Sequence, residues 1–107
     1  MPNKKVNEII ECLNNKISKS FNNFEGIYFY GSRAKGTYKQ NSDFDLIILF
    51  KNNYSSENEY RLAGIIGEIE YKYDIFIDYH PMTKKELERN PFFYDEVVKK
   101  GLYYEAA

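Results

Sequence analysis

One stretch of the chain, residues 31–46, reads GSRAKGTYKQNSDFDL. It joins a glycine–serine turn, two basic residues and an Asp-x-Asp pair in a short span. A turn that opens a helix presents backbone N–H groups, which suit phosphate oxygens. Two carboxylates on one face of a strand can hold a pair of magnesium ions. This stretch therefore predicts a site for a nucleoside triphosphate and divalent metal.

Two long helices are predicted on either side of this stretch. Apolar residues recur at helical spacing over residues 3–21 and again over residues 56–73, which indicates two amphipathic helices. We expect Ser56 to be the N-cap of the second helix, with Glu59 completing a capping box. Thr83 is expected to cap a further short helix in the same way.

Strands are expected between these helices. Runs of β-forming residues predict strands at residues 26–30, 43–50 and 74–80, and a short one at 102–104. Pro81 is expected to end the third strand. Alternating helices and strands of this length indicate an α/β or α+β fold, with a small sheet covered by helices on one side.

Glycine and serine add local detail to this outline. We expect Ser32 to be the N-cap of a short helix over residues 32–35, which Gly36 ends. Gly64 and Gly67 fall inside the second long helix, where each costs roughly 1 kcal/mol relative to alanine. Their presence there predicts close packing of this helix against the sheet.

The aspartates are the candidate metal ligands. Side chains alternate along a strand, so Asp43 and Asp45 point to one face, roughly 7 Å apart at their Cα atoms. An ionised Asp45 next to an apolar run is costly unless it is paired or bound to metal. Magnesium takes several oxygen ligands, and the third strand offers Asp74 and Asp78 on one face. We favour Asp78, which lies nearer the strand end, and Asp74 remains open.

Each of these features has a simpler interpretation when taken alone. Gly31 and Ser32 could form an ordinary strand-to-helix turn, and Asp43 could be a turn or capping residue. Arg33 and Lys35 could be solvated surface charges. It is the combination of all these features in one short span that favours a catalytic site.

Composition limits the other possibilities. A chain of 107 residues, 43% hydrophobic and 29% charged, is expected to form a single domain over residues 1–107. Its formal net charge of -1 argues against strong nucleic-acid binding. Cys12 is the only cysteine, which excludes an internal disulfide and fits a reducing compartment. The sequence lacks a run of about 18 apolar residues and a signal peptide, so we expect a cytoplasmic protein without membrane association.

The motif also resembles that of a known family. Residues 31–36 (Gly-Ser-Arg-Ala-Lys-Gly) followed by residues 42–46 (Ser-Asp-Phe-Asp-Leu) resemble the signature of the DNA polymerase β-like nucleotidyltransferase superfamily. The short chain is similar to the minimal nucleotidyltransferases (MNT), such as the MntA-like antitoxins of HEPN–MNT toxin–antitoxin pairs. This resemblance implies a nucleotidyltransferase fold, with a small mixed β-sheet and helices packed on one side.

The resemblance also implies an activity and a set of site residues. A hydroxyl on an acceptor would attack the α-phosphorus of a nucleoside triphosphate, with ATP as the expected donor and two Mg²⁺ ions as cofactors. Asp43, Asp45 and Asp78 would be the metal-binding and catalytic residues. Gly31 and Ser32 would bind the triphosphate.

The basic residues and the acceptor complete this expectation. Arg33 and Lys35 are candidate nucleotide-binding residues that could neutralise charge on the leaving pyrophosphate. The resemblance implies that the acceptor is a tyrosine of a cognate HEPN toxin, which adenylylation would silence. The alternatives are an antitoxin of the same fold that acts by binding alone, and a free-standing transferase for a small molecule or RNA end.

Aromatic residues near the C-terminus have two interpretations. They could form a contact surface for a partner, or they could cover the small sheet, which we favour. The residues concerned are Phe92, Phe93, Tyr94, Tyr103 and Tyr104. His80, the only histidine, is interpreted as a surface residue.

Overall fold

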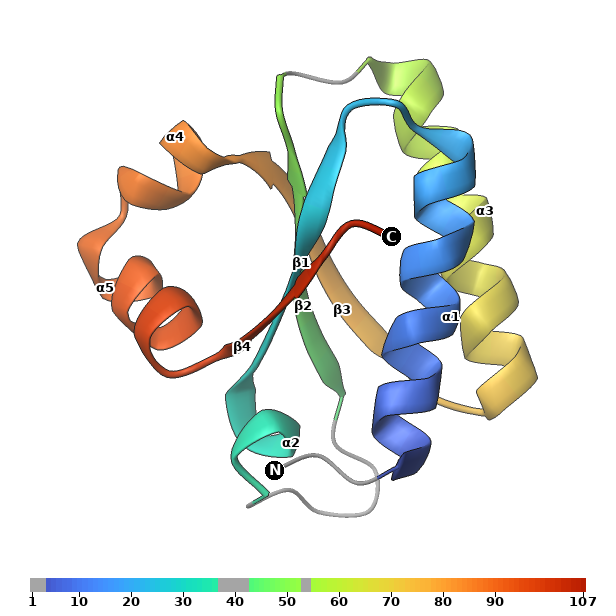
Figure 1. Ribbon diagram of the computed structural model, residues 1–107, viewed down its shortest axis with the longest axis horizontal. Coiled ribbons are helices and arrows are strands. Elements are labelled where there is room, and N and C mark those ends of the chain that lie inside the picture. Colours follow the sequence, from blue (N-terminus) through green and yellow to red (C-terminus); the bar gives the residue numbers. More distant parts are fainter. Residues whose placement is uncertain (1–3, 37–42, 53–54) are drawn as a thin grey trace.

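The computed structural model describes residues 4–36, 43–52 and 55–107 (Figure 1). Its long helices are α1 (Lys4–Ser20) and α3 (Ser56–Tyr73). The strands are β1 (Phe24–Tyr30), β2 (Phe44–Phe50), β3 (Ile77–Thr83) and β4 (Leu102–Glu105). The short helices are α2 (Gly31–Lys35), α4 (Lys84–Glu88), α5 (Pro91–Tyr94) and a π-helical turn, η1 (Asp95–Lys99).

The strands form a mixed sheet. Among the described residues the order is β3-β2-β1-β4, with β2 parallel to β3 and antiparallel to β1. β4 pairs with β1 in the antiparallel sense and forms the other edge. The predicted α+β fold with a small mixed sheet is therefore confirmed. None of the helices in the described part of the chain is both long and apolar enough to cross a membrane.

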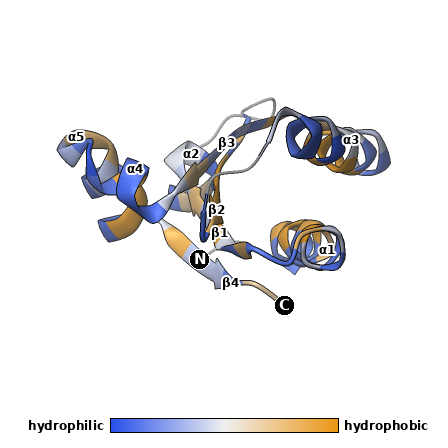
Figure 2. Cartoon of the chain, turned by 90° about the horizontal axis from the view of Figure 1, so that it is seen from above, coloured by the Kyte–Doolittle hydropathy of each residue, from blue (hydrophilic) through white to orange (hydrophobic). Residues whose placement is uncertain are grey.

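Both faces of the sheet are covered. Leu46 and Ile48 belong to the core under α1 and α3, whereas Ile47 and Leu49 pack on the opposite face with Val97 of η1. Figure 2 shows the long helices on one side of the sheet and α4 and α5 on the other. The long helices lie on one side as predicted. The short helices add a second layer because β2 is apolar on both faces, which requires cover on both.

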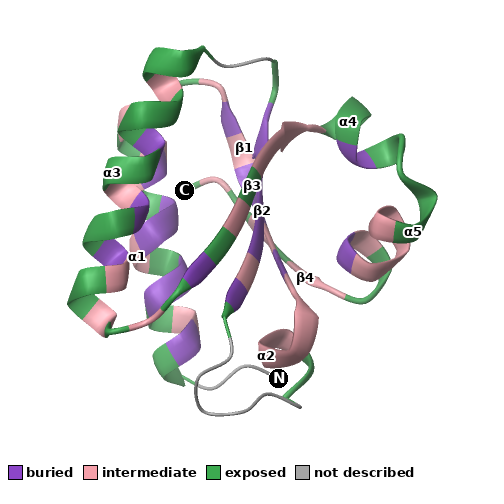
Figure 3. Cartoon of the chain, turned by 180° about the vertical axis from the view of Figure 1, so that it is seen from behind, coloured by how far each residue is buried: buried purple, intermediate pink, exposed green. Residues whose placement is uncertain are grey.

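The long helices form where the apolar stripes predicted them. α1 turns its apolar stripe toward the sheet, and α3 does the same, as the burial pattern in Figure 3 shows. The N-cap of α3 is Ser55 rather than Ser56, and Ser55 Oγ accepts the N–H of Asn58. The two serines are adjacent and equally suited to capping, so the sequence placed the cap one residue late. Thr83 and Glu86 do form the capping box of α4.

The third strand begins later than predicted. β3 starts at Ile77 instead of Asp74, because α3 continues to Tyr73 and Asp74 ends it with φ at +54°. Aspartate is one of the few residues besides glycine that visit this left-handed region. Pro81 lies inside β3 instead of ending it, which is possible because β3 is an edge strand.

The predicted packing of two glycines against the sheet is wrong. Gly64 and Gly67 are exposed, and a Cβ added at either would meet nothing within 4 Å among the described atoms. They lie on the outer face of α3, away from Leu62 and Ile66, which reach the core. The two glycines therefore weaken α3 without a packing role in this chain.

We expect Gly64→Ala and Gly67→Ala each to raise the free energy of unfolding by about 0.5–1 kcal/mol, because alanine lowers the entropy of the unfolded chain and fits the helix. Urea denaturation measures this change. Gly26→Ala is the matched control, since its Cβ would lie 2.6 Å from Cζ of Tyr103 and should destabilise the protein. A loss of stability in the α3 variants would contradict this prediction.

Candidate active site

The pairing of β2 with β3 brings two carboxylates together. Asp45 and Asp78 are in-register partners in this parallel pair, and Tyr30 is the partner of Asp45 on β1. Adjacent strands lie about 4.8 Å apart, so the three side chains form one row across the sheet. By the alternation of the strand, Asp45 shares its face with Ile47, which packs under the short C-terminal helices.

Asp43 extends this acidic group. It immediately precedes β2, which starts one residue later than predicted, and it is exposed. Burial is the main cause that raises the pKa of Asp45, and the charges of Asp78 and Asp43 raise it further. Both neighbours are therefore close enough for their charge to act on Asp45. The predicted acidic residues thus gather at one end of the sheet.

Asp74 is not part of the strand that carries Asp78. The expectation that Asp74 and Asp78 share one face of a strand is wrong, because Asp74 ends α3 and lies outside β3. Only Asp78 is in register with Asp45. By position Asp78 is therefore the neighbour of Asp45, and its role as the third ligand stays a prediction.

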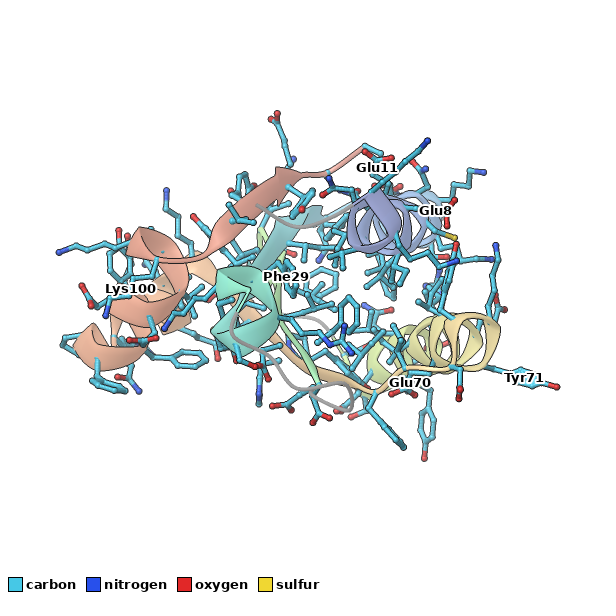
Figure 4. All side chains as sticks on the ribbon, turned by 90° about the horizontal axis from the view of Figure 1, so that it is seen from below. Glu8, Glu11, Phe29, Glu70, Tyr71 and Lys100 are labelled. Carbon is cyan, nitrogen blue, oxygen red and sulfur yellow. The ribbon has the colours of Figure 1, made fainter. Side chains whose placement is uncertain are left out.

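The glycine turn packs directly on Asp45. Gly31 adopts φ of +82°, which favours glycine, and a Cβ at this position would overlap Oδ2 of Asp45. Both the backbone conformation and the close approach therefore call for a glycine at the end of β1. α2 follows without a break, and Figure 4 shows it at the end of the sheet, between the two groups of helices.

The predicted cap of α2 is wrong in one detail. The N-cap is Tyr30, which makes no side-chain capping bond, and Ser32 lies inside the helix. The turn starts one residue early because Gly31 can already take up the required backbone conformation. Gly36 ends α2 as predicted, with φ of +78°. Ser42, which belongs to the sequence signature, lies outside the described residues.

The two basic residues of α2, Arg33 and Lys35, lie toward opposite faces of the sheet. Lys35 Nζ lies 3.2 Å from Oε2 of Glu96 in η1, on the side of the sheet that carries the acidic row. The Arg33 guanidinium carbon lies 4.5 Å from the centroid of the Phe44 ring, which belongs to the core under α1 and α3. Lys35 is therefore the basic residue that the structure brings to the face of Asp45.

Three aromatic rings lie beside the acidic row, and one of them, the His80 ring, is exposed as predicted. Tyr30 lies opposite Asp45, and its pKa is raised to about 12, mainly by burial and then by the charges of Asp45 and Asp78. Phe93 of α5 contacts the rings of both Tyr30 and His80 edge-on. In the sequence, the spacing of two residues between Asp78 and His80 already indicates that both side chains lie on one face of a strand.

The acidic residues suit a divalent cation by their chemistry. Carboxylate oxygens are the ligands that Mg²⁺ prefers, and the repulsion that raises the pKa of Asp45 would be relieved by a cation. Within the described residues, no three His, Cys, Asp or Glu side chains already converge on one point. Asp45 and Asp78 are paired in register and Asp43 lies close enough to act on Asp45, so these three carboxylates stay the predicted ligands, without a preformed cage among the described residues.

Comparison with known proteins identifies the family. The family model described as "Nucleotidyltransferase domain" matches residues 6–104. The chain belongs to this nucleotidyltransferase family. Enzymes of this family typically use a nucleoside triphosphate and a divalent metal ion, which agrees with the acidic row beside the glycine turn.

Individual relatives agree with this assignment. "Putative protein adenylyltransferase MJ0141" of Methanocaldococcus jannaschii is 32% identical over 76 residues, which cover 71% of this chain and 74% of the relative. A mutant of the toxin–antitoxin MntA-HpeT has a TM-score of 0.61 at 22% identity, covering 91% of this chain and 69% of that one. The structure of the tri-AMPylated Shewanella oneidensis HEPN toxin in complex with MNT antitoxin has a TM-score of 0.50 at 18% identity, covering 87% of this chain and 69% of that one. These two structures share the fold.

The glycine turn can be tested with two matched substitutions. Gly31→Ala and Gly36→Ala each force a residue with a Cβ into a left-handed conformation, which costs about 1–2 kcal/mol. Only Gly31→Ala also meets the Asp45 carboxylate, whereas Gly36 has open space around it. Urea denaturation should therefore show the larger loss of stability for Gly31→Ala. Equal losses would contradict the close contact with Asp45.

Asp45 should reduce the stability of the protein when no cation is present. Its pKa in the folded state is raised, so the folded chain loses stability as the pH rises from the ordinary aspartate pKa through that raised value. In EDTA at neutral pH, Asp45→Asn should therefore be more stable than the wild type in urea denaturation. Its advantage should shrink as the pH falls. A less stable Asp45→Asn protein at neutral pH would contradict this reading of the site.

Proposed function

We propose that this chain transfers AMP from ATP to a tyrosine hydroxyl of a HEPN-type toxin and thereby acts as its antitoxin. The observation that carries this proposal is the pairing of Asp45 with Asp78, directly beside the Gly31 turn. The name of the archaeal relative and the AMPylated toxin bound to a protein of the same fold support protein as the acceptor. A cytoplasmic location, where ATP is available, is part of the proposal.

Each site residue has a role in this proposal. Asp43, Asp45 and Asp78 would hold two Mg²⁺ ions, which would stabilise the charge that develops on the phosphates during transfer. Gly31, which packs on the Asp45 carboxylate, would present the backbone of the turn to the triphosphate beside the metal ligands, with Ser32 next to it. Lys35 would neutralise the leaving pyrophosphate, because it lies on the acidic face.

Asp78 is the carboxylate that an acceptor would meet first. It lies on the edge strand β3 with a half-exposed side chain, whereas Asp45 is covered by Gly31 and flanked by β1 and β3. In the proposed reaction the acceptor oxygen forms a bond to the α-phosphorus, and the bond to pyrophosphate breaks. Asp78 would accept the proton that the hydroxyl loses.

The proposal is tested by incubating the protein with ATP, Mg²⁺ and a HEPN-type protein identified from a neighbouring gene. Mass spectrometry should show AMP on a tyrosine of that partner. Asp45→Asn and Asp78→Asn should each lower the rate at least about 100-fold, since several kcal/mol of charge stabilisation is lost. Asp74→Asn is the matched control and should stay within about twofold.

Two outcomes would overturn the proposal. Toxin neutralisation by Asp45→Asn without any AMP transfer would show an antitoxin that acts by binding alone. Transfer of AMP to an RNA end or a small molecule, with the toxin left unmodified, would show that the chain is a nucleotidyltransferase. It would refute the proposal that the toxin is the acceptor.

A further inference from the structure

We propose that His80 is a positioning residue that holds the carboxylate of Asp78, and that Phe93 in turn fixes His80. The proposal rests on the proposed function for its consequence in catalysis, although the contacts themselves do not depend on it. In this proposal the short helix α5, which covers the second face of the sheet, orients the carboxylate of Asp78 through Phe93 and His80.

The contact between His80 and Asp78 follows from the strand. Both side chains lie on one face of β3, and Nε2 of His80 is 3.3 Å from Oδ1 of Asp78. Both are about half exposed, at 47% and 51% of the side chain. The in-register neighbour of Asp78 on β2 is Asp45, a like charge that repels it. At this distance an Nε2 N–H can turn toward Oδ1, which would counter this repulsion and limit the rotamers of an otherwise exposed side chain.

Phe93 fixes the position of the His80 ring. The two ring centroids are 6.2 Å apart, with an interplanar angle of 89°. Phe93 also meets Tyr30 edge-on at 5.6 Å, so it spans the row from β3 to β1. Its own backbone is held by Asn90, whose Oδ1 accepts the Phe93 N–H at 3.1 Å. Edge-on contacts between aromatic rings are favourable, so Phe93 biases the orientation of the His80 ring.

The consequence is a preorganised carboxylate. With Oδ1 held by His80, Oδ2 of Asp78 remains available to a cation or to the acceptor hydroxyl. Groups that orient a metal-binding side chain in this way commonly change metal affinity or activity by about 10–100-fold when removed. We therefore expect His80 to affect kcat and cation affinity, while the KM for ATP stays near the wild-type value.

The first test compares His80→Ala with His80→Gln. His80→Ala should lower kcat and weaken Mn²⁺ binding, measured by EPR on the protein without nucleotide, each by about tenfold. His80→Gln should recover most of both, because its amide N–H can replace Nε2. Tyr79→Phe is the matched control on the same strand, since Tyr79 packs into the opposite core and should change neither quantity.

The second test asks whether Phe93 acts through His80. Phe93→Leu, which keeps the bulk of the side chain, should weaken Mn²⁺ binding less than His80→Ala does, and the double variant should match His80→Ala alone. Phe92→Ala is the control for Mn²⁺ binding, because Phe92 on the same helix is 79% exposed. Thermal unfolding of each variant shows that its fold is intact.

The results separate this proposal from the proposed function. If wild-type protein transfers AMP and His80→Ala equals it in kcat and Mn²⁺ affinity, the positioning role is refuted and the function stands. If the wild type transfers no AMP but His80→Ala still weakens Mn²⁺ binding, the function is refuted and the positioning role stands. A His80→Gln protein that is folded yet as impaired as His80→Ala also overturns the proposal.

Discussion

The parallel pairing of β2 with β3 is the constraint on which the rest of the structure depends. A register shift of one residue would turn Asp78 to the other face of the sheet and bring Ile77 opposite Asp45. The same register places Leu46 and Ile48 under the long helices. The register that buries the apolar residues of β2 therefore also fixes the pairing of Asp45 with Asp78. A change in the packing of the core would change the geometry of the site.

This coupling explains why the second layer of helices matters. β2 is apolar on both faces, so Ile47 and Leu49 require cover by α4, α5 and η1. The same helices carry Phe93 and Glu96, which reach His80 and Lys35 next to the acidic row. The C-terminal helices α5 and η1 thus lie beside the acidic row, although Asp45 is far from them in the sequence.

The sequence predicted the parts of the site that depend on local patterns. The Gly31 turn and the alternation that separates Asp45 from Leu46 follow from short-range rules, and the structure places Gly31 against Asp45. The end of the second long helix at Tyr73 was predicted, but the start of β3 was not, because it depends on pairing with β2, which begins at Phe44 and Ile77. The prediction for Gly64 was wrong, since periodicity does not reveal what a helix face packs against. His80 is exposed as predicted, but its contact with Phe93 could not be predicted, because Phe93 comes from a separate element.

The account is tested most directly by locating the cation. Mn²⁺ added to isotope-labelled protein broadens NMR signals of nearby amides, and the broadening decreases steeply with distance. It should centre on residues 43–46 and 77–80 in the wild type and disappear in Asp45→Asn. Broadening centred on any other part of the chain, or unchanged broadening in Asp45→Asn, would contradict a metal-dependent transferase site at the end of β2 and β3.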